Sequence, residues 1–398
     1  MIVVGGSYTE TVLFPSFRTE LVGSGVRAAA TLGVDAAMLV TIAAPGEVGI
    51  VRSTVGARTT LEVVERHDPV EFRYLDPALA PQVTGLPTGS LEKLRSAFPD
   101  DDVLAFGLAE LPSGYPITAR RVVIDPQSPR NATGVLLDLV SADRIAVCAN
   151  RAEARLMTGL ASPMDAAAAL LARPQVEAVV VKCGPLGYVT ADSAGTEWAH
   201  ATPSLTVSTL GSGDIFSSIF ARGWFAGASA AEAASSASLA VAVSAGAPDP
   251  RGPDIVLPMN PGYAPRVYLA GPFFTLSERW LVERVRAVLT GLGARVFSPI
   301  HDVGPGDTEV AQKDLHGLDD CDVVFALLDW FDPGTLYETG WAARENIPVV
   351  GFSSEVHAKE TKMLVGMGAE VHTDLTSALF RTVWAGQGLT LTPGIHGA

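Results

Sequence analysis

Short apolar runs alternate with longer stretches of mixed apolar and polar residues along most of the chain. Before residue 246 the runs include MIVVGG, DVLAFGL, RVVIDP and EAVVVKCG, and after residue 266 they include RVYLAG, DVVFALLD and IPVVGFS. Between two of the later runs, SERWLVERVRAVLTGLG has a helical period that places Leu281, Val285, Val288 and Leu292 on one face. Near-continuous apolar strands that alternate with helices are typical of parallel sheets covered on both faces. The pattern therefore predicts an α/β fold.

One stretch interrupts this alternation. Residues 247–266 contain six prolines, which disfavour a regular helix or central strand and favour an extended connector. The chain of 398 residues is also long for one domain. We therefore expect a first domain over 1–246, a proline-rich linker over 247–265 and a second domain over 266–398. Ligands of open α/β sheets bind beyond the carboxyl ends of the strands, so the loops there are the places to search.

Composition narrows the class of function. The formal net charge of −15 argues against a non-specific binder of nucleic acid or of a membrane surface, although local donors can still hold a small anionic substrate. The three cysteines are far apart without CxxC spacing, and the seven histidines show no metal-ligand spacing. No leader-like segment opens MIVVGGSYTE, and no apolar run is long enough to cross a bilayer. We expect a soluble, cytoplasmic protein.

The segment STLGSGDIFSSIFARGW, residues 208–224, is the first candidate site. The small residues Gly211, Ser212 and Gly213 lead into a helical pattern, so backbone N–H groups can converge there with the positive end of a helix and form an anion hole. Asp214 beside it is either a catalytic base that accepts a proton from an attacking hydroxyl or simply the polar start of the helix. The segment alone leaves both interpretations open.

The second candidate site lies in DCDVVFALLDWFDPGTLYETGWAARENIPVVGF, residues 320–352. Asp332 and Glu338 follow an apolar strand, and Asp314 lies on the preceding helix. When carboxyl groups lie close together at strand ends, their like charges push their pKa values apart. One carboxyl can then act as a nucleophile and another as an acid. The alternative is a solvated acidic loop whose Glu is favoured by the helix dipole.

With the upstream segments ANRAEARLMTG and VVVKCGPLGY, the GSGD segment resembles the ribokinase-like (PfkB) carbohydrate and nucleoside kinase family, over about residues 1–246. The resemblance implies a ribokinase-like α/β/α sandwich that uses ATP and Mg²⁺, with Asp214 as base and Gly211, Ser212 and Gly213 as anion hole. It also implies that Asn150 and Glu153 organise Mg²⁺ and the nucleotide phosphates, that Lys182, Gly184 and Gly187 lie beside the nucleotide, and that Glu10 and Ser24 contact the acceptor.

Two features depart from that family. The family usually has an acidic residue where this chain has Ser208, and the domain is short for the family, which predicts a reduced lid over the acceptor site. The first domain is therefore either an active kinase or a degenerate nucleotide- or nucleoside-binding domain.

YLAGPFF, residues 268–274, followed by the acidic segments, resembles the nucleoside 2-deoxyribosyltransferase family with its nucleotide N-glycosidase relatives, over about 266–385. The resemblance implies a flavodoxin-like or Rossmann-like parallel-sheet domain in which Glu338 is the nucleophile at the anomeric carbon. It further implies that Asp332 contacts or protonates the leaving base, Asp314 holds sugar hydroxyls, Tyr268 orients Glu338, Gly271 lets the sugar approach, and Phe273 stacks on a base or packs in the core.

Where those transferases complete their site with an Asn from a neighbouring subunit, this chain offers Glu370, so hydrolysis and transfer both stay open. Together the two resemblances predict a bifunctional enzyme of nucleoside metabolism. Its kinase domain would phosphorylate a nucleoside or sugar, and its second domain would cleave or transfer the N-glycosidic bond. The alternative is a kinase-like sensor or scaffold joined to an active glycosidase. The expected partners are small nucleosides or nucleotides, and we expect a homo-oligomer.

Overall fold

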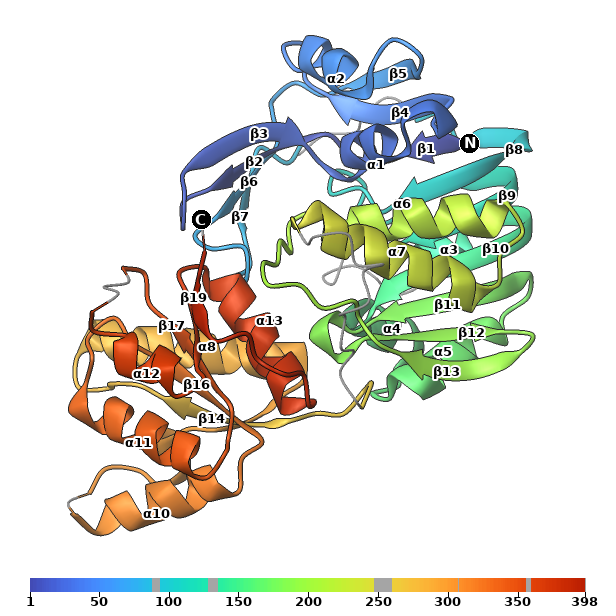
Figure 1. Cartoon of the computed structure of the whole chain (residues 1–398). Helices are drawn as coiled ribbons and strands as arrows, with labels where there is room; N and C mark the ends of the chain where they lie inside the picture. Colours follow the sequence, from blue (N-terminus) through green and yellow to red (C-terminus); the bar gives the residue numbers. More distant parts are fainter. Residues whose placement is uncertain (88–93, 128–134, 247–259, 307, 356–358, 398) are drawn as a thin grey trace.

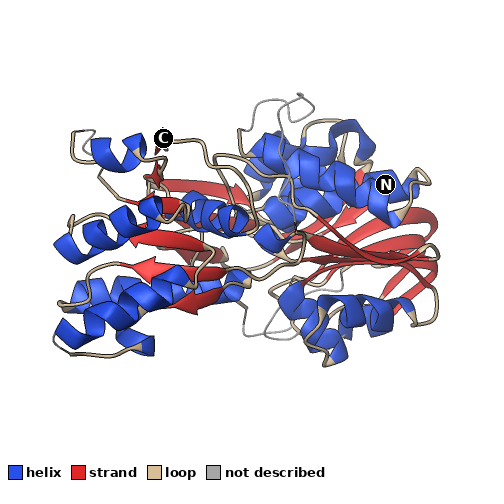
Figure 2. Cartoon of the chain, turned by 60° about the horizontal axis from the view of Figure 1, so that its bottom comes forward, coloured by secondary structure: helices blue, strands red, loops and turns tan. Residues whose placement is uncertain are grey.

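The computed structural model describes residues 1–87, 94–127, 135–246, 260–306, 308–355 and 359–397. It contains two α/β units, each with a central sheet between layers of helices (Figures 1 and 2). Most of the expected linker, residues 247–259, lies outside the described residues. No helix in the described ranges has the length and apolar character needed to cross a bilayer.

The first unit is built on a nine-stranded sheet in which only the pairs β11–β12 and β12–β13 are antiparallel. In spatial order its strands are β13 (Gly195–Ala199), β12 (Tyr188–Asp192), β11 (Val176–Lys182), β10 (Val140–Asn150), β9 (Ile117–Asp125), β8 (Ala97–Phe106), β1 (Ile2–Val4), β4 (Met38–Ala43) and β5 (Thr60–Glu65). The central strands are buried on both faces, as their apolar runs predict.

Helices cover both faces of this sheet. One apolar cluster joins the sheet to α1 (Ser24–Leu32), α2 (Val48–Val55), α6 (Ser212–Phe225) and α7 (Ala230–Ser244). A second joins the opposite face to α3 (Val135–Asp138), α4 (Arg151–Thr158) and α5 (Pro163–Leu171). Short 3₁₀ turns are η1 (Gly33–Asp35) and η2 (Gly184–Leu186). The predicted α/β/α sandwich is thus confirmed.

A separate four-stranded sheet, here called the lid sheet, stands over one end of the first unit (Figure 1). Its order is β3 (Arg18–Val22), β2 (Tyr8–Val12), β6 (Glu71–Tyr74) and β7 (Gln82–Thr84). A lid is therefore present as a sheet of four short strands, and the expectation that it is reduced relative to the family stays a prediction. It was based on domain length, and strands of three to five residues add little length to the chain.

The second unit is a six-stranded sheet whose neighbouring strands are all parallel. Its order is β15 (Arg295–Phe297), β14 (Arg266–Ala270), β16 (Val323–Leu327), β17 (Val349–Phe352), β18 (Glu370–His372) and β19 (Gly394–His396). The apolar clusters place α8 (Leu276–Leu292) and α13 (Leu375–Gly386) on one face of this sheet. They place α10 (Thr308–Asp319), α11 (Pro333–Arg344) and α12 (Lys362–Gly366) on the other face. The short helix α9 (Pro299–Asp302) follows β15. This is the expected Rossmann-like arrangement.

The predicted apolar face of α8 packs inward, with Val285 fully buried and Leu281, Val288 and Leu292 partly buried against the core. That core does not stop at the boundary between the units. One cluster of buried apolar residues continues from the α4 and α5 side of the first sheet into the α8 and α13 side of the second. The two units are therefore packed against each other as well as joined by the chain.

Candidate active sites

Asp214 lies in the first turn of α6 with its side chain only 8% exposed. Its Oδ2 accepts a hydrogen bond from Arg27 Nη1 at 2.6 Å, and its Oδ1 accepts one from the Gln127 amide. Arg27 reaches in the other direction to Glu10, with Nη2 to Oε2 at 2.7 Å. Burial raises the pKa of Asp214, although the Arg27 guanidinium opposes the shift. The candidate base is therefore held in an ion pair with a residue of α1.

The glycine at 211 is explained by this arrangement. Gly211 is the N-cap of α6 and has a φ of 73°, which favours glycine. A Cβ at this position would lie 2.1 Å from Arg27 Nε, so the guanidinium occupies the space that a side chain would need. The N–H groups of Gly213 and Asp214 have no acceptor within the helix, as at any helix start, whereas the Ser212 N–H donates to Thr209 O at 3.3 Å. The anion hole stays a prediction for this helix start.

Two cavities, of about 440 and 560 Å³, lie on either side of this helix start. Gln127, Thr209 and Gly213 line both of them. The first, here called the nucleotide cavity, is lined by Asn150, Glu153, Lys182, Gly184 and Gly187, which were predicted to hold the nucleotide and Mg²⁺. Of the predicted anion hole, Ser212 and Gly213 line this cavity, whereas Gly211 lines the second one. The second, the acceptor cavity, is lined by Asp214 and by the predicted acceptor residues Glu10 and Ser24. The predicted residues thus come together as two adjoining groups.

Lys182 ends β11 at the inner end of the nucleotide cavity. Its Nζ contacts Asp125 Oδ2 at 2.7 Å and Ser217 Oγ at 3.2 Å. Burial alone would lower the pKa of Lys182, but the neighbouring Asp125 carboxylate outweighs burial and raises it. A Cβ on Gly213 would lie 3.7 Å from this ammonium, so a fixed positive charge stands next to the start of α6. A phosphate group bound at this place would contact both the Lys182 ammonium and the start of α6.

Asn150 and Glu153 form a capping box at the start of α4. Asn150 Oδ1 accepts from the Glu153 N–H at 2.9 Å, and Glu153 Oε2 accepts from the Asn150 N–H at 2.7 Å. Burial and then the charge of Asp125 raise the pKa of Glu153 to about 7. The pair therefore has a local structural role in addition to its place on the cavity wall.

A magnesium ion fits this donor set only together with phosphate. Among the described residues no group of three or more His, Cys, Asp or Glu side chains is arranged to hold a metal ion. Mg²⁺ usually binds proteins through one or two carboxylates together with substrate phosphates and water. The carboxylate of Glu153 on the cavity wall matches that mode of binding.

The second site is centred on Tyr268 and Glu338. Tyr268 is fully buried on β14, and its hydroxyl donates a hydrogen bond to Glu338 Oε1 at 2.7 Å. Glu338 lies on α11, which follows β16, the strand next to β14 in the sheet. Burial, with smaller contributions from the charges of Asp314 and Asp332, raises the pKa of Glu338 to about 7, and the Tyr268 hydrogen bond opposes this shift. Of the four predicted side chains, Tyr268 and Glu338 are joined by a hydrogen bond, while Asp314 and Asp332 act on Glu338 through their charges.

Asp332 and Asp314 have different surroundings. Asp332 caps α11, where its Oδ2 accepts hydrogen bonds from the Thr335 N–H at 2.9 Å and the Thr335 hydroxyl at 3.2 Å. Asp314 on α10 has a buried Oδ1 for which the described residues provide no hydrogen-bond donor. Burial raises the pKa of Asp314. An unpartnered buried acceptor of this kind suits a hydroxyl donated by a ligand.

Gly271 and Phe273 follow β14. A Cβ on Gly271 would lie 3.0 Å from Leu327 Cδ1, so close packing against β16 already requires a small residue there. The half-buried Phe273 ring lies 5.4 Å from the ring of Phe274, which is 68% exposed. Core packing therefore does not explain Phe274, and stacking on a ligand stays a prediction for Phe273.

The suggestion that Glu370 replaces an Asn given to a neighbouring subunit is wrong. Glu370 lies on β18 with no exposed surface and binds Arg381 through Nε at 2.8 Å and through Nη2. Burial would raise the pKa of Glu370, but hydrogen bonds from His372 and Arg381 outweigh it and lower the pKa to about 2. Glu370 is an ion-paired residue of the sheet that cannot reach another subunit.

Arg27, Gln127 and Asp125 were not predicted as site residues. Arg27 had a detectable signal, because it is the one charged residue in the otherwise small and apolar helix segment SGVRAAATL. Gln127 and Asp125 follow an apolar run in the usual way and stand out only in three dimensions.

Comparisons with known proteins match two separate parts of the chain. Residues 114–254 match the family model described as pfkB family carbohydrate kinase, and residues 267–376 match the model described as nucleoside 2-deoxyribosyltransferase. The chain therefore contains a kinase domain of the pfkB type followed by a domain of the nucleoside 2-deoxyribosyltransferase type. A comparison with curated proteins gave no match.

Solved structures similar to this chain come from the same kinase group. A PfkB protein from Polaromonas sp. JS666 is 17% identical with a TM-score of 0.45, covering 63% of this chain and 97% of that chain. A ribokinase from Thermotoga maritima is 17% identical with a TM-score of 0.44, covering 61% and 92%. A nucleoside kinase from Burkholderia thailandensis is 18% identical with a TM-score of 0.41, covering 63% and 95%.

Proposed function

We propose that this protein is a two-site enzyme of nucleoside metabolism that cleaves or transfers an N-glycosidic bond at Glu338 and transfers a phosphoryl group at Asp214. The observation that carries the proposal is the Tyr268–Glu338 pair. It is a half-buried carboxyl with a pKa of about 7, held at 2.7 Å by a buried phenol, close to an aspartate that has an unpartnered oxygen. Buried carboxyls with raised pKa values are concentrated at active sites.

In the proposed glycosidic step, a Glu338 carboxylate oxygen forms a bond to the anomeric carbon of the sugar. The bond between that carbon and the base nitrogen breaks, and its electron pair leaves with the base, which takes a proton from Asp332 or from water. Water or a second base then attacks the same carbon and releases Glu338, giving hydrolysis or transfer. Asp314 would accept hydrogen bonds from the sugar hydroxyls, and Tyr268 would keep Glu338 oriented.

In the proposed phosphoryl step, ATP occupies the nucleotide cavity and a nucleoside or sugar occupies the acceptor cavity. Asp214 would take the proton of the acceptor hydroxyl, whose oxygen attacks the terminal phosphorus while ADP leaves. Lys182 and the N–H groups at the start of α6 would hold the transferred phosphoryl group. Glu153, together with the phosphates, would hold Mg²⁺, which when bound neutralises charge on them.

The order of the two reactions determines the products. If a nucleoside is phosphorylated first, the second site would release a free base and a sugar phosphate from the resulting nucleotide. If the glycosidic bond is cleaved first, the kinase site would receive the released sugar. Both orders use a small nucleoside or nucleotide, so a macromolecular substrate is not needed.

A second candidate function is favoured by the Arg27–Asp214 ion pair. In it, the kinase-like domain binds nucleotide or nucleoside as a sensor, and only the second domain does chemistry. The guanidinium 2.6 Å from Asp214 occupies a position that an acceptor hydroxyl would need, and Ser208 replaces the acidic residue usual in the family. Nucleotide binding without phosphate transfer would support this candidate over an active kinase.

We also propose that the protein works in the cytoplasm as a homo-oligomer whose contacts lie near the second site. Phe274 comes from the segment that follows Tyr268, and Trp330 and Tyr337 come from the segment that carries Asp332 and Glu338; they are 68%, 45% and 61% exposed. Exposed aromatic groups of this kind are enriched at protein interfaces. Light scattering should give at least a dimer mass, and a monomer would contradict this part of the proposal.

The test is incubation of the protein with a panel of nucleosides and nucleotides, with and without ATP and Mg²⁺, read by mass spectrometry. Release of a base by the wild type and its loss in Glu338→Gln would support the glycosidic step. Base release that persists in this variant would refute Glu338 as the nucleophile. A phosphorylated product that needs ATP and disappears in Asp214→Asn would separate the active kinase from the sensor.

A further inference from the structure

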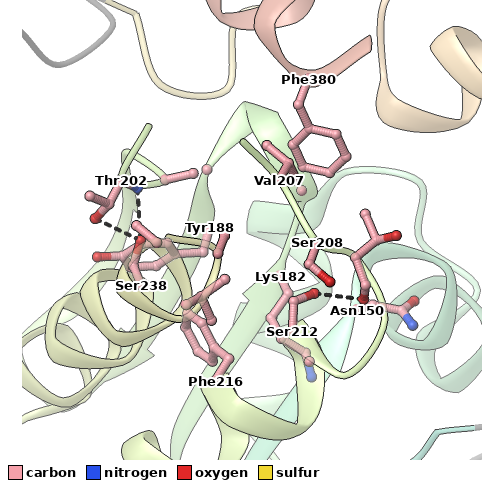
Figure 3. Close-up of a pocket in the computed structure, with 18 of the residues that line it drawn as sticks. Asn150, Lys182, Tyr188, Thr202, Val207, Ser208, Ser212, Phe216, Ser238 and Phe380 are labelled. Atoms are coloured by element: carbon pink, nitrogen blue, oxygen red, sulfur yellow. Dashed lines mark hydrogen bonds between the residues drawn. The ribbon is translucent and has the colours of Figure 1, made fainter. Parts of the chain in front are cut away.

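Helix α13 of the second unit also forms part of the wall of the nucleotide cavity in the first. Ala378, Leu379 and Val383 are buried on the face of α13 that packs on the second sheet. Phe380 and Trp384, from the same helix, line the nucleotide cavity. In Figure 3 the Phe380 ring projects from the α13 ribbon into the cavity beside Val207. A cavity built from first-domain residues is thus completed by two aromatic side chains of the other domain.

The position of α13 over the cavity is fixed by hydrogen bonds at its N-terminal end. The Val207 N–H, in the segment before the anion hole, donates to Ser377 Oγ at 2.9 Å. The Thr376 hydroxyl donates to Asp76 Oδ1, close to the lid sheet, at 3.3 Å. One turn further along the helix, Arg381 is anchored in the buried ion pair with Glu370. These contacts tie the helix to the walls of both domains.

The chemistry of the cavity changes along its length. Lys182, Ser212 and the start of α6 provide cationic and N–H groups at one end, which suit phosphate. The rest of the lining is mostly small or apolar, and includes Val241 and Ala242 of α7. The total volume of about 440 Å³ is within the range of pockets that hold small organic ligands.

Phe380 stands at this apolar part with its ring half-buried, which leaves part of the ring free to contact a ligand. It is held edge-to-face on Trp384, with ring centroids 5.7 Å apart and planes at 73°. Gly184 lies beneath it, since a Cβ there would be 3.9 Å from Phe380 Cζ. Trp384 is itself almost fully buried, and its indole N–H has no acceptor among the described residues.

We propose that the base of a nucleotide bound in this cavity packs against Phe380, so that the second domain supplies part of the nucleotide site of the first. This inference rests on the proposed nucleotide site and adds to it a specific contact from the fused domain. Aromatic rings stack on any nucleobase, because every base has a π face. Binding of a nucleotide should then hold the two domains together, since its base and its phosphates contact different domains.

The first test is calorimetric titration of the full chain with a non-hydrolysable ATP analogue and Mg²⁺, compared with inorganic tripolyphosphate. Phe380→Ala should weaken binding of the analogue by at least about fivefold, the lower limit for loss of one base–aromatic stack, and should leave tripolyphosphate binding unchanged. Phe380→Trp, which keeps an aromatic face, should bind the analogue within about twofold of the wild type. Trp280→Ala is the matched control, because it removes an exposed aromatic of α8 that does not line the cavity.

The outcomes separate the two levels of the proposal. If the wild type binds neither the analogue nor tripolyphosphate, the proposed nucleotide site fails and this inference fails with it. If the wild type binds the analogue and Phe380→Ala binds it equally well, the contact with Phe380 is refuted while the nucleotide site stands. Equal weakening of the analogue and tripolyphosphate would also refute the contact with the base.

A second measurement does not depend on any variant that could fail to fold. In the wild type, hydrogen exchange of the α13 amides, residues 375–386, should slow when the ATP analogue is added. The α10 amides, on the opposite side of the second sheet, should not change. Unchanged exchange in α13 at saturating analogue would overturn the inference.

Discussion

Replacing Tyr268 with phenylalanine removes one hydroxyl and with it the 2.7 Å hydrogen bond to Glu338 Oε1. The ring is fully buried and stacks on Phe297 with centroids 5.5 Å apart, so phenylalanine retains this packing. The hydrogen bond stabilises the charged form of Glu338 and opposes the rise in its pKa caused by burial. Without it, the pKa of Glu338 should rise further above about 7.

The size of the shift follows from the energy of a hydrogen bond to a charged group, about 1.5–3 kcal/mol. One pKa unit corresponds to about 1.4 kcal/mol, so the loss corresponds to roughly one to two units. A nucleophile must be deprotonated, and a higher pKa leaves less carboxylate at neutral pH. In Tyr268→Phe, base release at pH 7 should fall by roughly five- to fiftyfold and recover as the pH is raised.

The assay is kcat/KM for base release as a function of pH, which reports the ionisation of the free enzyme. The acid limb, near pH 7 in the wild type, should move upward by one to two units in the variant. Tyr337→Phe is the matched control, since that tyrosine is next to Glu338 in sequence but 61% exposed. An acid limb that stays in place, or a loss of rate that is equal at every pH, would refute the role assigned to this hydrogen bond.

Three further results are expected. Glu338→Gln should abolish base release and spare ATP turnover. The same variant should raise the free energy of unfolding by about 1–3 kcal/mol at pH 8 but not at pH 4. The reason is that folding raises the pKa of Glu338, so the wild-type protein loses stability as the pH rises from about 4.5 to 7. Denaturant unfolding at both pH values tests this. Asp214→Asn should abolish phosphoryl transfer and leave base release from a pre-phosphorylated substrate, and equal loss of both would contradict separate sites. Glu370→Ala should lower the free energy of unfolding by about 3–5 kcal/mol, because it leaves the Arg381 guanidinium buried and unpaired, whereas no change in the unfolding midpoint would contradict a structural role.

Local patterns made most of the fold predictable. The apolar runs became the buried strands, and the stretch with a helical period, residues 277–293, became α8 (Leu276–Leu292) with its expected face inward. The lid sheet was not predicted because its strands are short and half-exposed, so they lack the apolar runs that mark the central strands. The length of the first domain does not reveal a sheet built from strands this short.

The sites were predictable where chemistry is concentrated in a short segment. Gly211 to Asp214 are contiguous, and Asp332 and Glu338 share one loop and helix. The Arg27–Asp214 ion pair joins residues 187 positions apart, so no local pattern contains it. This ion pair nevertheless determines whether the Asp214 carboxylate is available to accept a proton. It is therefore the most important contact that could not be predicted from the sequence.

The packing of the two domains against each other also depends on residues that are far apart in the sequence. The proline-rich stretch predicted only an extended connector between two domains, and such a connector alone would leave the first domain to complete its own cavity. The structure instead has one apolar cluster that crosses between the units and one helix, α13, whose side chains belong to both. Because Ser377 and Phe380 lie on a single rigid turn, a shift that moves the phosphate-side loop at Val207 must also move the aromatic wall of the cavity. The second domain is therefore a structural component of the first site, whatever reaction each of them carries out.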